Sequence, residues 1–506
     1  MRRRLTSILF AGTLAVSVAG CSAGNTQADG PSPANASVNP PSPANASVNP
    51  PSAADAGAQP PSRNLTPDER FNELYYEKLE AQENRNGIGL TKEQMLEDYD
   101  YLHRVLVENY PYIGVAKRKY GADFEAGYAQ GRRNLEQCET DVDFYLEISR
   151  LIDSMKGTGH LSIYGPSIVL SEMEGYQEML EDGGLPEDMM WYKPWVDEYL
   201  SPPVTEHAAA WNDLLGTSYV SAYDQTLEEF NLQRDGEEEN VKTEMIKAGE
   251  TAYVSIASFD TGTYDKDREI LFSFYRQAAD CDNLIIDISR NGGGSMGYYR
   301  DLIVAPNIDE DVYWLNYVFL KDGEINRRYH PDLDEMYFPL DTSPDRIREQ
   351  LLGEYSGQER KKIEPFLSAV GIPPKMNRQD LEALDLYCPS LNSIQPVNGE
   401  KMFKGKIWVL VSEDVYSSSE SFASFCKTTG FATLVGTRTG GDGIGSDPLL
   451  YVLPNSGIVG RYAWIYGTVQ DGTGSEEFGT EPDYLSEEGE TALDTCLRII
   501  KGEPQR

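Results

Sequence analysis

The chain has 506 residues, which is enough for two or three domains with a well-formed core. It carries 44 lysines and arginines against 82 aspartates and glutamates, so its formal net charge is −38 with neutral histidines. Binding of nucleic acid or anionic lipid through a basic face needs clustered lysine and arginine, and this charge argues against both. No Asp-x-Asp-x-Asp-Gly calcium loop occurs, so we assign no metal and no cofactor.

The N-terminus has the plan of a bacterial lipoprotein signal. Three arginines at residues 2–4 precede an apolar stretch over residues 5–18, which is too short for an ordinary membrane span. The sequence Val-Ala-Gly-Cys at residues 18–21 resembles a lipobox, which implies cleavage before Cys21 and lipid on its sulfur. We therefore expect residues 1–21 to be a signal peptide and Cys21 to anchor the protein to the cell membrane on the extracytoplasmic side. An ordinary signal peptide with a coincidental cysteine is the alternative.

A low-complexity segment follows the signal. The decapeptide Pro-Ser-Pro-Ala-Asn-Ala-Ser-Val-Asn-Pro occurs twice, at residues 31–40 and 41–50. A segment rich in Pro, Ala, Ser and Asn and without aromatic residues cannot bury a core. Residues 22–66 are therefore predicted to be a disordered tether. The five cysteines after Cys21 show no paired motif, and their disulfide pairing is left open.

Helical periodicity dominates the next part of the chain. Met95, Tyr99 and Leu102 recur at three- and four-residue spacing after a start signal at Thr91. We assign residues 67–165 to an N-terminal helical domain. The region 166–248, rich in Trp, Tyr, Glu and Pro, is an intermediate region in which no glycine-centred carboxylate-binding loop occurs.

Strand and helix patterns alternate in the C-terminal half. β-rich runs occur within residues 251–259, 284–288, 407–411 and 433–435, and helical patterns lie near 266–279 and 417–429. This alternation predicts an α/β fold with a mostly parallel sheet over residues 249–503. An insertion at about 309–400 interrupts this core, and residues 346–374 within it are expected to be helical.

Ser417 stands where the apolar run Ile407–Val411 gives way to a helical pattern that begins near Glu420. A serine at a strand-to-helix junction lies near unpaired helix N–H groups, which stabilise a developing anion. This placement suits a nucleophile. The alternative is that Ser417 only caps the helix, with Glu420 completing a capping box.

Five segments in this order resemble the tail-specific (C-terminal processing) peptidase superfamily, which includes the tricorn core protease and the interphotoreceptor retinoid-binding protein modules. They are Thr-Gly-His-Leu at 158–161, Ile-Asp-Ile-Ser-Arg-Asn-Gly-Gly-Gly at 286–294, Ser-Ser-Ser-Glu at 417–420, Val-Gly-Thr-Arg-Thr-Gly-Gly at 435–441 and Gly-Thr-Glu-Pro-Asp at 479–483. The resemblance covers roughly residues 90–165 and 250–490. It implies a ClpP/crotonase-like α/β core with an N-terminal helical domain and insertions. The carboxylate-binding PDZ module of many relatives is expected to be absent from 166–248.

The resemblance also implies the site residues. Ser417 would be the nucleophile, His160 its base and Glu476 the carboxylate that orients His160, with the adjacent Glu477 as the alternative. The backbone N–H groups of Gly293, or a neighbouring glycine, and of Ser418 would bind the oxyanion.

Two positions depart from relatives of this superfamily. Asp442 stands where bacterial members carry a dyad lysine, which excludes a Ser–Lys dyad unless another lysine substitutes. Gly159 replaces a hydroxyl residue before the histidine, a contact that Thr158 is the candidate to supply.

We expect a serine peptidase of the cell envelope that hydrolyses peptide or protein substrates through an acyl-enzyme. The main alternative is a catalytically silent lipoprotein that uses the same fold as a ligand- or peptide-binding module. An esterase with the same triad is a third interpretation. The sequence leaves the preferred substrate and the oligomeric state open.

Overall fold

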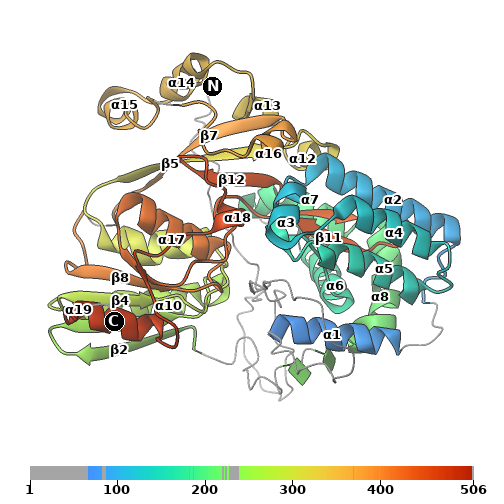
Figure 1. Ribbon diagram of the computed structural model, residues 1–506, viewed down its shortest axis with the longest axis horizontal. Helices are drawn as coiled ribbons and strands as arrows, with labels where there is room; N and C mark the ends of the chain where they lie inside the picture. The colour runs from blue at the N-terminus through green and yellow to red at the C-terminus, as the bar shows by residue number, and fades with distance from the viewer. Residues whose placement is uncertain are drawn as a thin grey trace, which may run out of the picture.

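The computed structural model describes residues 67–81, 87–181, 183–185, 187–218, 221–222, 225–226, 239–368, 370–397 and 399–503. The predicted signal peptide and tether, with Cys21, lie outside these residues. Figure 1 shows a helical part, α1 to α8, beside an α/β part that contains the C-terminus. No helix among the described residues is both long and apolar enough to cross a membrane.

The helical part begins with five helices: α1 (Pro67–Glu80), α2 (Lys92–Asn109), α3 (Ile113–Tyr120), α4 (Phe124–Leu135) and α5 (Asp141–Ser154). The start signal at Thr91 is confirmed as a full capping box with Gln94. Met95, Tyr99 and Leu102 are buried along one face of α2, as their spacing predicts. The region after them is also helical, with α6 (Pro166–Glu181), a 3₁₀ turn (Glu187–Tyr192), α7 (Lys193–Tyr199), α8 (Pro202–Trp211) and a π-helical turn (Asn212–Gly216).

A six-stranded sheet forms the α/β part, in the order β13-β9-β8-β4-β3-β2. The strands β3 (Thr251–Ile256), β4 (Asn283–Asp287), β8 (Lys406–Val411), β9 (Thr433–Gly436) and β13 (Tyr484–Leu485) are parallel, and β2 (Val241–Lys247) pairs antiparallel with β3. The mostly parallel sheet is therefore confirmed.

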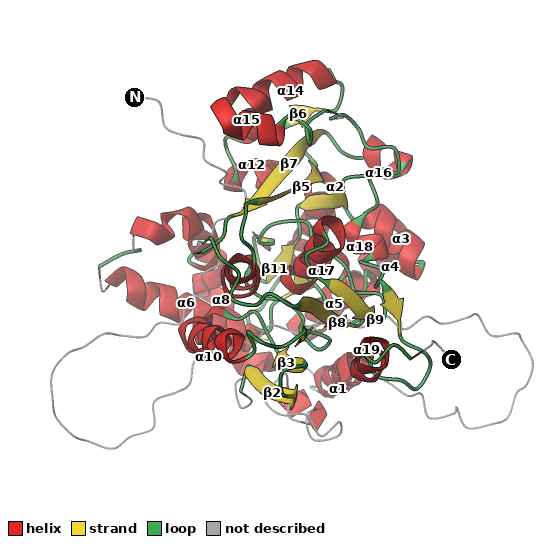
Figure 2. Cartoon of the chain, turned by 90° about the vertical axis from the view of Figure 1, so that its left-hand side faces the viewer, coloured by secondary structure: helices red, strands yellow, loops and turns green. Residues whose placement is uncertain are grey.

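Helices cover both faces of this sheet because its strands alternate their buried side chains. Leu284, Ile286 and Val409 pack with α10 (Tyr264–Gln277) and α17 (Ser418–Thr429) on one face. Ile285 and Leu410 pack with α19 (Ala492–Ile500) on the other. Figure 2 shows α17 and α19 on opposite sides of β8 and β9. The predicted fold class is confirmed.

Between β4 and β8 the chain builds most of a second, antiparallel sheet in the order β12-β5-β7-β6. Its strands are β5 (Val312–Leu320), β6 (Phe338–Pro339), β7 (Leu386–Ile394) and β12 (Ile465–Val469). Short helices surround it: α12 (Glu324–Tyr329), α13 (Leu333–Met336), α14 (Pro344–Gly353), α15 (Gly357–Ile363) and α16 (Arg378–Glu382). The helices expected within 346–374 are α14 and α15, which lie at the top of Figure 1.

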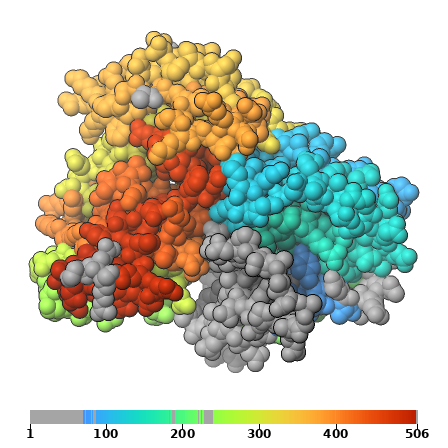
Figure 3. All heavy atoms as spheres, in the orientation of Figure 1, coloured from blue at the N-terminus to red at the C-terminus, as the bar shows by residue number. Residues whose placement is uncertain are grey.

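A third, three-stranded sheet joins the two parts. The strand β1 (Ser162–Ile163) of the helical part pairs with β11 (Val459–Tyr462), which pairs in turn with β10 (Leu449–Val452). The N–H of Ala463 extends this junction by donating to the carbonyl of Gly159 at 2.7 Å. In Figure 3 the N-terminal helices lie directly against the C-terminal segments, and their apolar residues share one core. This junction fixes His160 against the α/β part.

Candidate active site

Ser417 lies in a strained turn between β8 and α17. Its backbone has φ 58° and ψ −126°, a conformation that a residue with a side chain rarely adopts. Its carbonyl accepts the first helical bond, from the Ser421 N–H at 2.9 Å, but its hydroxyl makes no bond to the helix N-terminus. The interpretation of Ser417 as a mere helix cap is therefore wrong. The turn directs the hydroxyl away from the helix.

The neighbouring polar side chains support this turn. The Ser419 hydroxyl accepts a bond from the Tyr416 N–H at 3.1 Å and lies 2.5 Å from the carbonyl of Asn291, in the glycine turn. Glu420 accepts a bond from the Thr480 hydroxyl at 2.7 Å and does not form the capping box. These contacts tie the serine turn to the two loops beside it.

His160 faces Ser417 from the helical part of the chain. It ends a single 3₁₀ turn, Thr158–His160, that precedes β1. Its Nε2 lies 3.2 Å from the Ser417 hydroxyl, within hydrogen-bond reach. Its Nδ1 lies 2.6 Å from a carboxylate oxygen of Asp442. Ser417, His160 and Asp442 thus form a continuous hydrogen-bonded chain.

Asp442 corrects the expected orienting carboxylate. Glu476, in α18 (Ser475–Phe478), is buried but bonds to Tyr416 at 3.0 Å and to Lys119 at 3.4 Å, not to His160. The alternative, Glu477, forms an ion pair with Arg118 at 2.7 Å. Asp442 reaches His160 because it lies in the loop between β9 and β10, beside Gly441, whose carbonyl accepts the Ser417 N–H at 3.1 Å.

Backbone strain is concentrated in Ser417, His160 and Asp442. Among the described residues only four that are not glycine have positive φ, and three of them are Ser417, His160 and Asp442; the fourth is Lys156. Each such conformation costs on the order of 1–3 kcal/mol and persists only where the surroundings enforce it. Such strain is typical of functional sites, which supports a role for the triad beyond packing.

The glycine turn at residues 292–294 packs directly on Ser417. A Cβ on Gly293 would lie 2.9 Å from the Ser417 Cβ, and Gly293 has φ +117°, so a side chain is excluded twice over. The Gly293 N–H, expected to bind an oxyanion, instead donates to the Asn291 side chain at 2.9 Å. The Ser418 N–H opens α17 and has no acceptor within the described part of the chain. Of the two expected donors, Ser418 is therefore the available one here.

Lys119 and Glu476 form a buried layer behind the triad. Burial raises the pKa of Glu476 to about 8, although the Lys119 ammonium lowers it. Lys119, on α3, donates to the Glu476 carbonyl at 2.7 Å as well as to its carboxyl group. Burial has the largest single effect on the pKa of Lys119 and lowers it, but the charges and hydrogen bonds of Glu476 and Tyr120 together raise the lysine pKa above its ordinary value. Because the Lys119 ammonium is bonded to Glu476 and not to Ser417, Lys119 does not replace the dyad lysine.

Tyr112 explains why Gly159 replaces a hydroxyl residue. A Cβ at position 159 would lie 2.3 Å from the Tyr112 ring. The Tyr112 hydroxyl donates to the carbonyl of Ile465 at 2.7 Å and lies 3.2 Å from the second carboxylate oxygen of Asp442. Thr158 does not supply the missing contact, because its hydroxyl donates to the Met155 carbonyl at 2.7 Å. Sequence reasoning missed Tyr112, which no motif marks.

No group of three His, Cys, Asp or Glu side chains within the described ranges is placed to hold a metal ion. The described cysteines are free, and most are buried. The site therefore consists of the triad, the Ser418 N–H and the buried layer behind them.

Residues 250–486 match the model of Peptidase family S41. This part of the chain belongs to that family. The match contains the motifs around Ser417, Gly293 and Asp442, while His160 lies before it. The assignment confirms the tail-specific protease superfamily that the motifs predict.

Several solved structures are similar to this chain at low sequence identity. A protein of Parabacteroides merdae is 17% identical over 80% of this chain and 96% of its own, with a TM-score of 0.46. Mature CPAF is 13% identical over 82% and 99%, with a TM-score of 0.46. The photosystem II D1 C-terminal processing protease is 13% identical over 81% and 97%, with a TM-score of 0.40. Among the curated proteins no match was found.

Proposed function

We propose that the protein is a serine-type peptidase in which Ser417 is the nucleophile, His160 the general base and Asp442 the carboxylate that orients His160. The observation that carries this proposal is the bridging position of His160. One ring nitrogen lies 3.2 Å from the Ser417 hydroxyl and the other 2.6 Å from Asp442. This is the geometry that an alcohol nucleophile needs.

In this mechanism the Asp442 carboxylate accepts the Nδ1–H of His160, which leaves Nε2 free to take the Ser417 proton. The Ser417 oxygen then attacks the peptide carbonyl, and a tetrahedral intermediate with a negative oxygen forms. The Ser418 N–H, at the positive end of the α17 dipole, is placed to stabilise that oxygen. Protonated His160 returns its proton to the leaving amine, an acyl-enzyme remains, and water activated by His160 hydrolyses it.

The strain at the triad favours catalysis over a silent binding module. A module that only binds has no need to hold Ser417, His160 and Asp442 at positive φ, since relaxation would stabilise the fold. An esterase would use the same acyl-enzyme, so the choice between peptide and ester substrates rests on the family of residues 250–486.

A serine-directed fluorophosphonate tests the nucleophile. The wild type should be labelled and should cleave peptides, whereas Ser417→Ala should lose both properties. Ser424→Ala removes a buried hydroxyl from the same helix, α17, and is a matched control that should keep both. Peptide turnover by Ser417→Ala at the wild-type rate would disprove the proposed mechanism.

We also propose that the enzyme is anchored at the cell membrane through lipid on Cys21, with its active site on the extracytoplasmic side. The order of basic, apolar and lipobox residues in 1–21 supports this location. Metabolic labelling with a fatty acid should mark the wild type and not Cys21→Ala. Equal labelling of the two would reject the anchor without affecting the catalytic proposal.

A further inference from the structure

Asp447 is an acidic residue beside the triad that the mechanism does not use. It lies five residues after Asp442, in the loop that leads into β10, and its side chain is partly buried. Among the described residues no hydrogen-bond donor and no cationic lysine or arginine pairs with its carboxylate. A carboxylate that is partly withdrawn from water and has no partner is unfavourable, so a cation that pairs with it from outside would be stabilising.

The three-stranded sheet places Asp447 at the same end as His160. Arg461 on the central strand β11 pairs with Ser162 on one side and Leu450 on the other. The outer strands β1 and β10 are therefore parallel, about 10 Å apart, given ~4.8 Å between neighbouring strands. His160 comes two residues before β1 and Asp447 two residues before β10. The two residues thus lie on either side of the end of β11.

The loop around Asp447 is held from both sides by buried tryptophans. The Trp464 indole donates to the Ser446 hydroxyl at 2.8 Å, and the Trp195 indole donates to the Pro448 carbonyl at 2.9 Å. Two residues before Asp447 the loop borders open space, since a Cβ on Gly445 would meet no atom within 4 Å. The backbone on both sides of Asp447 is therefore held in place by hydrogen bonds.

His160 itself cannot be the hydrogen-bonding partner of Asp447, because both of its ring nitrogens are engaged by Ser417 and Asp442. The two residues are nevertheless close enough to interact. Burial raises the pKa of Asp447 to about 6, and the charge of His160 is what lowers it. Above that pH the carboxylate is ionised and can bind a cationic group of another molecule.

Resting on the proposed peptidase function, we infer that Asp447 binds a cationic group of the substrate beside the bond that Ser417 attacks. The group is either a lysine or arginine side chain or the free α-ammonium of a peptide. Both carry N–H donors and a positive charge, which a partly buried carboxylate binds with charge-assisted hydrogen bonds. The net charge of −38 would also draw cationic peptides toward the protein.

The test compares matched peptides on the full-length protein. One series carries lysine, arginine, norleucine or glutamate at each position around the scissile bond, and each peptide is made with a free and an acetylated N-terminus. We expect kcat/KM for the preferred cationic peptide to exceed that of its neutral match by about tenfold or more. Loss on replacing lysine identifies a side-chain site, and loss on acetylation identifies an α-ammonium site.

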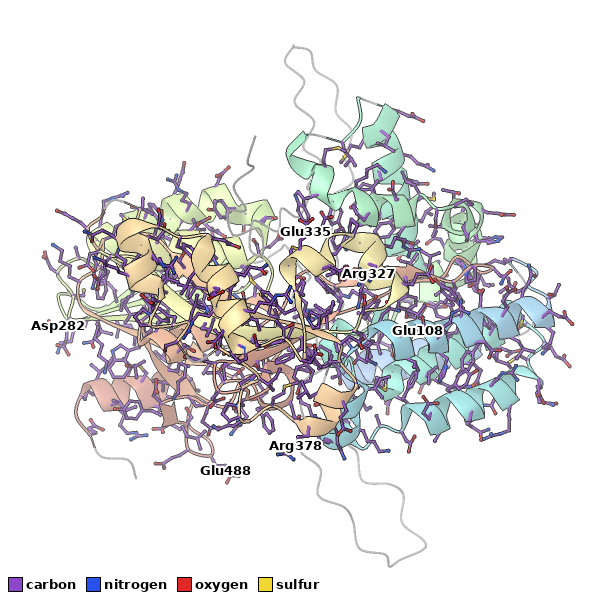
Figure 4. All side chains as sticks on the ribbon, turned by 90° about the horizontal axis from the view of Figure 1, so that it is seen from above. Glu108, Asp282, Arg327, Glu335, Arg378 and Glu488 are labelled. Atoms are coloured by element: carbon purple, nitrogen blue, oxygen red, sulfur yellow. The ribbon has the colours of Figure 1, made fainter. Side chains whose placement is uncertain are left out.

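Asp447→Asn should reduce this cationic preference to about twofold or less, and Asp447→Lys should favour glutamate. Glu488→Gln removes one negative charge at the edge of the α/β part, away from the N-terminal helices in Figure 4, and should keep the full preference. An unchanged preference in Asp447→Asn would overturn the inference, as would a wild type without any cationic preference.

Binding of the same peptides to Ser417→Ala, followed by fluorescence anisotropy, separates this inference from the peptidase proposal. Cationic preference in binding that Asp447→Asn removes would support the Asp447 site even if the wild type cleaves nothing. Cleavage without charge preference would reject the Asp447 site and leave the peptidase proposal standing.

Discussion

The helical part and the α/β part contribute to the candidate active site in different ways. The α/β part supplies Ser417 and Asp442 from loops that follow parallel strands, where its motifs are dense. The helical part supplies His160 from one 3₁₀ turn, with Tyr112 and Lys119 on the segment before and within α3. Neither part alone contains both the proposed nucleophile and its proposed base. The proposed catalysis therefore depends on the junction between the two parts as much as on the residues themselves.

The largest loss of activity should come from weakening the hydrogen bond between Asp442 of the α/β part and His160 of the helical part. Asp442→Asn keeps the shape of the side chain but removes the acceptor charge for Nδ1, which favours the wrong tautomer of His160. We expect kcat to fall by about 10⁴-fold, as in other triads. Turnover of a chromogenic peptide measures this loss.

Glu476→Gln is the matched comparison for Asp442→Asn. Glu476 touches Tyr416 and Lys119 and not His160, so we expect less than about tenfold loss of kcat. If the Glu476 variant were the more damaged of the two, the assignment of Asp442 as orienting carboxylate would be wrong.

Gly159→Ala should cause a smaller loss of activity at the same junction. The new Cβ would meet the Tyr112 ring at 2.3 Å, so the 3₁₀ turn that carries His160 must shift. A displacement of about 1 Å at a catalytic base costs on the order of 10²-fold in rate. Peptide turnover together with thermal unfolding distinguishes this displacement from global unfolding.

Gly121→Ala provides the control for backbone strain. Gly121 has φ +74° in the same part of the chain, but a Cβ there would meet nothing within 4 Å. It should lose stability by about 1 kcal/mol while keeping its rate. Equal loss of rate in both glycine variants would mean that the Tyr112 contact does not position His160.

The α/β part should respond to pH through Glu420. Burial raises the pKa of Glu420 to about 8. The native state thus holds a proton between about pH 4.5 and 8 that the unfolded chain releases. The free energy of unfolding should therefore fall as pH rises through this window, by about 2 kcal/mol from pH 6 to 8 for this group. Denaturant titrations at several pH values measure it, and Glu420→Gln should flatten the decline. An equally steep decline in Glu420→Gln would assign the effect to other groups.

The smallest effect expected is that of Tyr112→Phe. This variant loses the hydroxyl 3.2 Å from Asp442 while keeping the ring that packs on Gly159. We expect kcat to fall by roughly three- to tenfold with little change in KM, since the residue acts through Asp442. Tyr451→Phe is the control, because the buried Tyr451 hydroxyl has no partner among the described residues. A change in KM alone would argue against a positioning role.

Sequence reasoning succeeded where local pattern and chain order decide the outcome. The parallel strands, α10 and α17 follow from short apolar runs and helical spacing. The approach of His160 to Ser417 followed from the motif resemblance, although 257 residues separate them. The motifs around His160 and Ser417 identify residues that act through their own side chains, so the motifs alone were enough to predict them.

The orienting carboxylate could not be predicted in the same way. Asp442 and Glu476 are both acidic, both buried and both close to Gly441, and only the path of the loop after β9 decides which one reaches Nδ1. The Gly293 N–H was likewise expected to bind an oxyanion, because its hydrogen bond to the Asn291 side-chain oxygen, two residues away, depends on the side-chain torsion of Asn291. Tyr112 carries no motif, since its role arises from tertiary packing alone.

The position of β1 has a consequence for how the chain matures. Ser162 pairs with Arg461, almost 300 residues later, and the Gly159 carbonyl bonds to Ala463. Contacts of such long sequence separation form late, because a large loop must close before they stabilise anything. During synthesis, which runs from the N-terminus, His160 is present long before the strand that holds it. The order of synthesis therefore keeps the proposed triad unassembled until β11 has been made.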